Sequence, residues 1–160
     1  MDDLYQLPGH LIRRLQQAAV SIFMAEVGEV GQDLTPVQFG ALAVTKQYPG
    51  LDQATLAGLI AYDRTTIGGV VDRLVQKGLV LRVVSDQDRR ARELRLTAAG
   101  ERLLDQAIPH VERVQQIILS GLDGSEQKQF LALLKKTTEA VNDRSRAPLR
   151  IPKKQNADTT

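Results

Sequence analysis

The feature that most constrains this chain is a change of hydrophobic period at Gly78. Before Gly78, apolar residues recur every three or four positions in two short segments, each preceded by an aspartate that suits a helix N-cap. After it the period changes: two short runs rich in valine, leucine and arginine flank a polar, turn-prone stretch, and in the second run Leu94 and Leu96 alternate with charged residues. The pattern predicts a helix over Gln53–Ile60, a second helix from Asp63 to Lys77, and a hairpin of strands Leu79–Val84 and Arg92–Thr97.

Helical patterns flank this segment on both sides. Their predicted bounds are Pro8 to about Gly28 or Gly31, Thr35–Tyr48, Thr97–Gly121 with a kink at Pro109, and a last helix capped by Ser125 that runs to Val141. The mostly polar tail 143–160 is predicted to be disordered. We therefore expect a mainly α fold with a small β-hairpin wing, as a single domain over 1–142. It would comprise a winged helix-turn-helix at about 35–97 and flanking helices at about 8–31 and 98–142.

The composition excludes several classes of function. The chain has 160 residues with no cysteine and two histidines, which excludes thiol catalysis, zinc ribbons and a three-histidine zinc site in one chain. It has no glycine-rich phosphate loop, nucleophile elbow or His-Glu-x-x-His motif, so we predict no catalytic residue, no metal ligand and no cofactor. No apolar run approaches the roughly 18 residues of a membrane helix, and the N-terminus is acidic, so we expect a cytoplasmic protein without membrane contact.

The helix that ends at Lys77 has one apolar and one polar face. At about 100° per residue, its apolar side chains gather on one side: Ile67, Val70, Val71 and Leu74. Thr65 and Gly69 fall opposite, and Thr66 and Arg73 lie on the flank. In a DNA-reading helix the first residues contact base edges, so Thr65 and Thr66 are predicted to read bases and Arg73 to contact phosphate. The alternative is a solvated amphipathic helix packed on a helical core.

The hairpin carries a cluster of basic residues. Five arginines lie within fourteen residues: Arg82, Arg89, Arg90, Arg92 and Arg95. Arginine suits both bidentate phosphate binding and insertion into a narrow minor groove. Asp88 is badly placed to touch DNA but well placed to brace an arginine across the turn. The net charge of +2 is too small to argue for nucleic acid by itself, and an exposed hairpin with internal ion pairs is the alternative.

These motifs together resemble the MarR family of bacterial transcription regulators. The likeness covers about residues 8–142 and rests on Leu56-Ala57, Asp63-Arg64-Thr65-Thr66-Ile67, Val71–Val80, Asp88-Arg89-Arg90-Ala91 and Leu96-Thr97-Ala98-Ala99-Gly100. It implies a homodimeric winged helix-turn-helix repressor of operator DNA that dimerises through its N- and C-terminal helices. It also implies that Arg90 enters the minor groove and that Asp88 orients arginines at the base of the wing.

One departure from the family pattern affects base reading. Gly68 and Gly69 stand where many members carry Thr or Ser and Arg, so readout is expected to depend more on Thr65, Thr66 and DNA shape. Glycine also permits close backbone approach, either to DNA or to a neighbouring helix. The predicted DNA-binding residues are Arg64, Thr65, Thr66, Gly69, Arg73, Arg82, Asp88, Arg89 and Arg90.

The first helix carries the candidate ligand site. Its apolar face centres near Leu15 and Ile22, and Arg14 lies about a quarter-turn away, so Arg14 is expected to lean half-buried into a cleft. Such an arginine needs an anionic partner, which is a carboxylate of the protein or of a ligand. The segment Leu7–Arg14 is similar to the branch of the family that senses aromatic acids, which adds His10 and the solvent-facing Arg13 to the candidate set.

The sequence therefore leads to one functional hypothesis with open alternatives. The hypothesis is a ligand-responsive homodimeric repressor, released from a pseudo-palindromic operator by a small aromatic carboxylate. The alternatives are a multidrug- or phenolic-responsive regulator of the same family, a helical interaction module that does not bind DNA, and an enzyme built from scattered residues. The shortage of histidine and cysteine argues against the enzyme.

Overall fold

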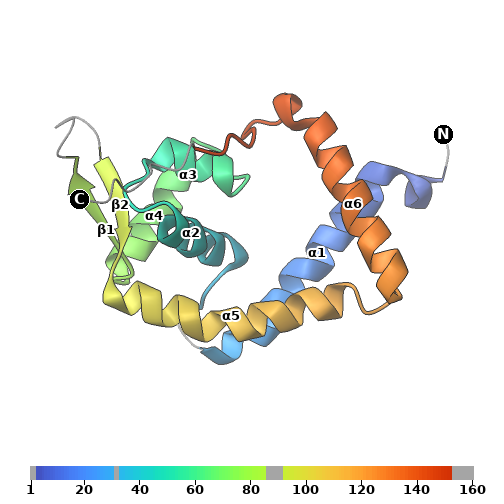
Figure 1. Ribbon diagram of the computed structural model, residues 1–160, viewed down its shortest axis with the longest axis horizontal. Helices are drawn as coiled ribbons and strands as arrows, with labels where there is room; N and C mark the ends of the chain where they lie inside the picture. Colours follow the sequence, from blue (N-terminus) through green and yellow to red (C-terminus); the bar gives the residue numbers. More distant parts are fainter. Residues whose placement is uncertain (1–2, 31–32, 86–91, 153–160) are drawn as a thin grey trace, which may run out of the picture. The chain divides into compact units, whose positions relative to one another are not determined.

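The computed structural model describes residues 3–30, 33–85 and 92–152. Six α-helices and one two-stranded antiparallel sheet lie within these residues, which confirms a mainly helical fold with a small hairpin (Figure 1). The contacts divide the chain into two compact units. Unit 1 combines Met1–Pro36 with Asp105–Leu134, and unit 2 combines Val37–Leu104 with Lys135–Thr160. The boundaries between the units fall within the two C-terminal helices, α5 and α6, so each of these helices contributes residues to both units.

Unit 2 holds the helix-turn-helix and the hairpin. Its elements are α2 (Pro36–Gln47), α3 (Gln53–Leu59), α4 (Ile67–Gln76), β1 (Val80–Val84), β2 (Arg92–Leu96) and the start of α5 (Ala98–Ile118). The strands pair in antiparallel register from Val80 opposite Leu96 to Val84 opposite Arg92. Its core is formed by buried leucine and isoleucine side chains of the helices, of β2 and of the turn before β1: Leu42, Leu56, Ile67, Leu74, Leu79, Leu94, Leu103 and Leu104. Strand β1 adds Val80.

Two helix starts in unit 2 follow the predicted capping residues. The Asp52 carboxylate accepts hydrogen bonds from the backbone N–H groups of Ala54 (2.8 Å) and Thr55 (2.9 Å), which begins α3. The Thr97 hydroxyl accepts from the Gly100 N–H (3.0 Å) and donates to the Gly78 carbonyl oxygen (2.7 Å). Thr97 therefore begins α5 and also ties it to the turn that follows α4.

The start of α5 requires a glycine. A Cβ atom at Gly100 would collide with the backbone carbonyl of Leu79. The Leu79 carbonyl also accepts a hydrogen bond from the Thr97 N–H (3.1 Å), so it is fixed in place. The motif Leu96-Thr97-Ala98-Ala99-Gly100 is therefore explained by packing of α5 against the hairpin base.

The second helix of the helix-turn-helix begins later than predicted. We expected Asp63 to cap it directly, but α4 starts at Ile67, and residues 64–66 form a turn. The reason is that the Asp63 carboxylate accepts hydrogen bonds from the backbone N–H (2.8 Å) and the hydroxyl (2.7 Å) of Thr65. This Asx-type turn occupies the side chain before a helix can form.

The last helix also begins differently from the prediction. Helix α6 (Gly124–Ala140) is capped by Asp123 rather than by Ser125. The Asp123 carboxylate accepts from the backbone N–H groups of Ser125 (2.8 Å) and Glu126 (2.9 Å), while the Asp123 N–H donates to the Glu126 carboxylate (2.9 Å). This is the reciprocal arrangement of a capping box, and the Glu126 N–H lowers the pKa of Asp123.

The prediction of a disordered tail is wrong for residues 143–152, and the remainder lies outside the described residues. A short 3-10 helix, η3 (Asn142–Arg144), follows α6, and Ala147 is 6% exposed. Composition is a local property, whereas the burial of Ala147 is a tertiary contact, so the polar sequence gave no sign of it.

Unit 1 contains α1 (Pro8–Val27), the 3-10 helices η1 (Leu4–Gln6) and η2 (Gly28–Val30), and parts of α5 and α6. The buried side chains of α1 are Phe23 and Val27, both in its C-terminal half. Leu15 of the predicted apolar face is exposed. The Arg113 guanidinium contacts the Glu26 carboxylate at 3.2 Å and joins α5 to α1. Helix α5 continues through Pro109. None of the helices in the described part of the chain is both long and apolar enough to cross a membrane.

Candidate DNA interface

The turn that precedes α4 presents two threonines to solvent. Thr65 and Thr66 are both exposed, as the helical periodicity predicted. Asp63 holds the backbone and hydroxyl of Thr65, and the Thr66 hydroxyl donates to the Asp63 carbonyl oxygen (3.2 Å). The Thr65 hydroxyl and N–H, together with the nearby Arg146 guanidinium, lower the pKa of Asp63, so this carboxylate is ionised at neutral pH. We call residues 63–66 the recognition turn.

Helix α4 buries one face and leaves the other free. Its four buried side chains are Ile67, Val70, Val71 and Leu74, the set that the sequence predicted. Gly69 is exposed, and a Cβ atom there would meet nothing within 4 Å. A Cβ atom at Gly68 would lie 3.4 Å from the Gln53 side chain of α3. The two glycines therefore differ: Gly68 faces the neighbouring helix, and Gly69 faces open space.

Basic side chains flank the recognition turn and α4. Arg64 and Arg73 are both exposed, in agreement with their assignment to the outer surface. Asp72 is the acidic residue on this surface of α4, and its carboxylate lies 2.6 Å from the Arg82 guanidinium. Arg82 thereby neutralises the negative charge of Asp72, which would otherwise repel DNA phosphate.

Arg82 has partners within the protein that the sequence did not indicate. Besides Asp72, its guanidinium donates to the Gln53 side-chain oxygen (3.3 Å). Arg82 therefore links β1 to α3 and α4, and it fixes the hairpin relative to the helix pair. Gln53 was missed by the sequence analysis because no local pattern signals a contact between residues 29 positions apart. DNA contact by Arg82 stays a prediction.

The base of the wing is anchored by the loop that precedes α3. The Gly50 N–H donates to the Leu94 carbonyl (2.9 Å), and the Leu94 N–H donates to the Leu51 carbonyl (2.9 Å), so the loop before α3 pairs with β2. The Arg95 guanidinium contacts the Glu93 carboxylate at 3.0 Å. Arg92 is exposed. The predicted wing-tip residues Asp88, Arg89 and Arg90 lie outside the described residues.

The candidate ligand residues lie on α1 in unit 1. Arg13 and Arg14 are both exposed, so the predicted half-burial of Arg14 is wrong for this chain taken alone. The apolar face beside Arg14 is itself uncovered here, which removes the cause of that burial. His10 is half-buried, and its ring packs edge-on against Tyr5 with centroids 5.6 Å apart. Its Nε2 atom is buried and has no hydrogen-bond partner among the described residues.

Comparisons with known proteins decide the family. The model of the MarR family matches residues 32–91. The transcriptional repressor NicR of Pseudomonas putida is 31% identical over 138 residues, which cover 86% of each chain. The chain belongs to the MarR family. As a member it is a DNA-binding transcriptional repressor and not an enzyme, with the winged-helix fold of that family.

Two solved structures of MarR-type regulators match this MarR-family chain along almost their whole length. The PcaV regulator of Streptomyces coelicolor, in complex with its natural ligand, is 37% identical with a TM-score of 0.79, over 88% of this chain and 98% of PcaV. BpsR of Bordetella bronchiseptica, whose DNA binding is regulated by 6-hydroxynicotinic acid, is 27% identical with a TM-score of 0.80, over 87% and 98%.

The MarR-family chain also exposes large apolar side chains on two of its helices. The exposed residues at the N-terminal end are Leu4, Tyr5, Leu7, Leu11, Ile12 and Leu15, and those on α6 are Leu131, Leu133 and Leu134. No residue of α6 is buried. Large exposed apolar patches are typical of interaction sites. These residues fall in or beside the terminal helices through which the family resemblance implies dimerisation.

Among the described residues, no group of three or more His, Cys, Asp or Glu side chains is placed to hold a metal ion.

Proposed function

We propose that this regulator is a homodimer that represses by binding a pseudo-palindromic operator through α4 and the wing. The observation that carries the proposal is the recognition turn: Thr65 and Thr66 point outward from a turn that Asp63 orders, directly ahead of a helix with a buried apolar face. A winged helix uses the N-terminal end of its second helix to meet base edges in the major groove.

The chemistry around the turn supports a division of roles. Both threonine hydroxyls donate to Asp63, so they can accept hydrogen bonds from base edges, and the threonine methyl groups can contact thymine methyls. Arg64 and Arg73 are exposed beside the turn and suit phosphate contacts, which set the register of the protein on the duplex. Arg89 and Arg90 at the wing tip would add contacts to phosphate or to a narrow minor groove. Gly69 leaves room for close approach of DNA to α4.

The exposed apolar side chains of α1 and α6 support a two-fold dimer. An isologous dimer buries the same surface on both chains and places two recognition helices symmetrically. Such a dimer fits half-sites about one helical turn apart, roughly 34–36 Å. The operator would therefore be a pseudo-palindrome.

The proposed effector is a small aromatic carboxylate. Arg14 offers a guanidinium that binds carboxylate in a bidentate manner, and the orphaned Nε2 of His10 lies on the same helix. The regulation of the relative BpsR by 6-hydroxynicotinic acid supports this chemical class. Release would occur by population shift, because a ligand that binds the non-DNA-binding arrangement more tightly draws the protein away from the operator.

Selection of a duplex from a random-sequence library by the wild-type protein tests the DNA-binding part. The selected sequence is expected to be a pseudo-palindrome. Arg14→Ala then tests the effector part: it should bind the selected duplex like wild type but no longer be released by benzoate-like acids in an anisotropy titration. Arg13→Ala is the matched control. Its release from the duplex by these acids should be impaired less than the release of Arg14→Ala. Release of Arg14→Ala at wild-type acid concentrations would contradict the proposed ligand site.

A further inference from the structure

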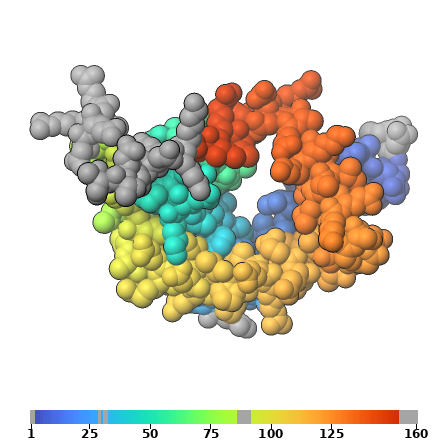
Figure 2. All heavy atoms as spheres, in the orientation of Figure 1, coloured from blue at the N-terminus to red at the C-terminus, as the bar shows by residue number. Residues whose placement is uncertain are grey.

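The C-terminal segment 142–152, which we call the strap, packs within unit 2 against α3. Figure 1 draws it in red, leaving the end of α6 and running to α3, and Figure 2 shows its atoms directly against those of the helix-turn-helix. Nothing in the roles of α4 and the wing accounts for this segment. It approaches Gly58 of α3, which precedes the recognition turn, and its Arg146 lies near Asp63, the first residue of that turn.

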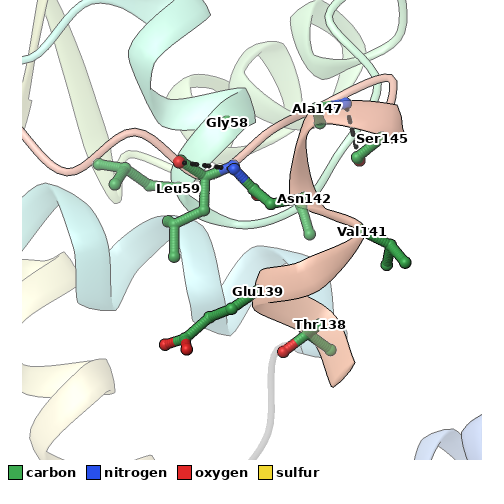
Figure 3. Close-up of a pocket in the computed structure, with 10 residues that line it drawn as sticks. Gly58, Leu59, Thr138, Glu139, Val141, Asn142, Ser145 and Ala147 are labelled. Atoms are coloured by element: carbon green, nitrogen blue, oxygen red, sulfur yellow. Dashed lines mark hydrogen bonds between the residues drawn. The ribbon is translucent and has the colours of Figure 1, made fainter. Parts of the chain in front are cut away.

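The strap has a fixed internal geometry. The Asn142 side chain forms two hydrogen bonds with the backbone of Leu149: its amide donates to the carbonyl (3.3 Å), and its carbonyl oxygen accepts from the N–H (2.8 Å). The Ser145 hydroxyl accepts from the Ala147 N–H (3.0 Å), as Figure 3 shows. These bonds close residues 142–149 into a loop and aim Ala147 inward.

The strap sits close to the C-terminal end of α3. Ala147 is buried, and a Cβ atom at Gly58 would lie 3.3 Å from the Pro148 carbonyl oxygen. The absence of a side chain at Gly58 is therefore what lets the strap backbone approach α3. The strap, α3 and the end of α6 also line a mostly apolar cavity of about 500 Å³, which Ala61 borders (Figure 3).

The turn between α3 and the recognition turn has an unfavourable backbone. Ala61 has a φ of +53°, in the left-handed region that a non-glycine residue rarely adopts. The Tyr62 N–H donates to the Ala57 carbonyl (2.9 Å), which fixes the exit direction of the chain toward Asp63. Such a conformation persists only where surrounding contacts enforce it. The strap lies next to this turn: its Pro148 carbonyl oxygen approaches Gly58 at the end of α3, and its Ala147 lines the same cavity as Ala61.

The ion pair between the strap and the recognition turn adds little stability. The Arg146 guanidinium lies 3.9 Å from the Asp63 carboxylate, but its side chain is 91% exposed. Exposed pairs of this kind contribute little to stability. The position of the strap therefore depends on Ala147 and on the Asn142–Leu149 bonds rather than on this charge pair.

We propose that the strap is a positioning element for DNA binding: through Ala147 it holds the Ala61 turn, and thereby Thr65 and Thr66, in the arrangement that reads DNA. The proposal rests on the proposed function of the recognition turn. It makes Ala147 a positioning residue that does not itself touch DNA.

Two substitutions that add the same charge separate this role from simple electrostatic attraction. Ala147→Arg places a large cation at a buried position, whereas Ile151→Arg places it on the same segment at a residue that is 69% exposed. Binding of each to the selected duplex is measured by anisotropy. We expect Ala147→Arg to bind about tenfold more weakly than wild type and Ile151→Arg to bind equally well or more tightly. Equal or tighter binding by Ala147→Arg would overturn the proposal.

Residue-resolved hydrogen exchange gives a second readout that needs no DNA. In Ala147→Arg and in Asn142→Ala, which changes no charge, the amides of residues 61–66 should exchange at least about threefold faster than in wild type. The amides of α2 should be unchanged, which shows that the unit remains folded. Unchanged exchange at residues 61–66 in both variants would reject the strap's role even if the wild type binds DNA. Failure of the wild type to select any duplex, with faster exchange in the variants, would instead reject the proposed function.

Ala61→Gly provides a suppressor test. Glycine adopts the left-handed conformation without strain, so it should reduce the need for the strap. Ala147→Arg lowers the free energy of duplex binding by some amount in the wild-type background. In the Ala61→Gly background this loss should be less than about half as large. An undiminished loss would show that the strap does not act through the Ala61 turn.

Discussion

Single side chains at the proposed interface have separate tasks. Asp63 orders the recognition turn by accepting two hydrogen bonds from Thr65, so its carboxylate is already bonded within the protein. Because the Thr65 hydroxyl lowers the pKa of Asp63, the ionised carboxylate stabilises the turn above the ordinary pKa of the group, and this contribution is lost as the pH falls through the lowered value. The turn therefore keeps its geometry throughout the neutral range.

Gly69 allows a prediction in which stability and function change in opposite directions. Because a Cβ atom there meets nothing, Gly69→Ala should raise the free energy of unfolding by roughly 0.5–1 kcal/mol, the difference in helix propensity. If DNA approaches this part of α4, the same methyl group should weaken binding to the selected duplex. Urea denaturation and anisotropy measure the two effects.

Gly9→Ala is the control for this substitution. Gly9 lies near the start of α1, and a Cβ atom there also meets nothing within 4 Å. The control should not change duplex affinity. Wild-type affinity in Gly69→Ala would remove Gly69 from the interface.

The helices and strands show which sequence signals were sufficient. Asp52 and Thr97 were predicted correctly as caps because each bonds to backbone groups two or three residues away. The start of α4 was placed too early because Asp63 has two uses for its carboxylate, a cap or an Asx turn, and the pattern suits both. The order of Ala147 and the pairing of Arg82 with Gln53 could not be predicted, because both depend on residues distant along the chain.

The contacts of Arg82 predict that the wing and the helix pair are coupled. Arg82→Ala and Asp72→Asn should each lower the free energy of unfolding, and the double variant should show a coupling of up to about 1 kcal/mol, since both side chains are partly exposed. Both variants should also weaken duplex binding, because the hairpin is less firmly held. A double-mutant cycle by urea denaturation measures the coupling free energy, and anisotropy measures the duplex affinity.

Arg95→Ala is the matched control for that cycle. Its partner Glu93 lies on the same strand, so the pair joins no two elements. It should leave duplex affinity closer to wild type than Arg82→Ala does. Additive effects of Arg82→Ala and Asp72→Asn would contradict the coupling.

The molecule as a whole is expected to act as a two-fold dimer. Leu133→Glu places a charge in the exposed apolar surface of α6, where the side chain is 55% exposed, and should convert the dimer into a monomer. Sedimentation velocity measures the change, and duplex affinity should fall because one half-site alone is bound. Lys135→Glu adds acidic charge to the same helix without removing apolar surface and should remain dimeric. A wild-type protein that sediments as a stable monomer would contradict this account.

The central claim is that the recognition turn reads bases while the arginine-rich wing holds the DNA backbone. The most direct test is the affinity for the selected duplex as a function of salt concentration, measured for wild type, Arg90→Ala and Thr65→Ala. We expect both variants to bind more weakly, with a flatter salt dependence for Arg90→Ala, since each phosphate contact contributes a slope of about 0.9, and an unchanged slope for Thr65→Ala. Wild-type affinity and slope in both variants would contradict the claim.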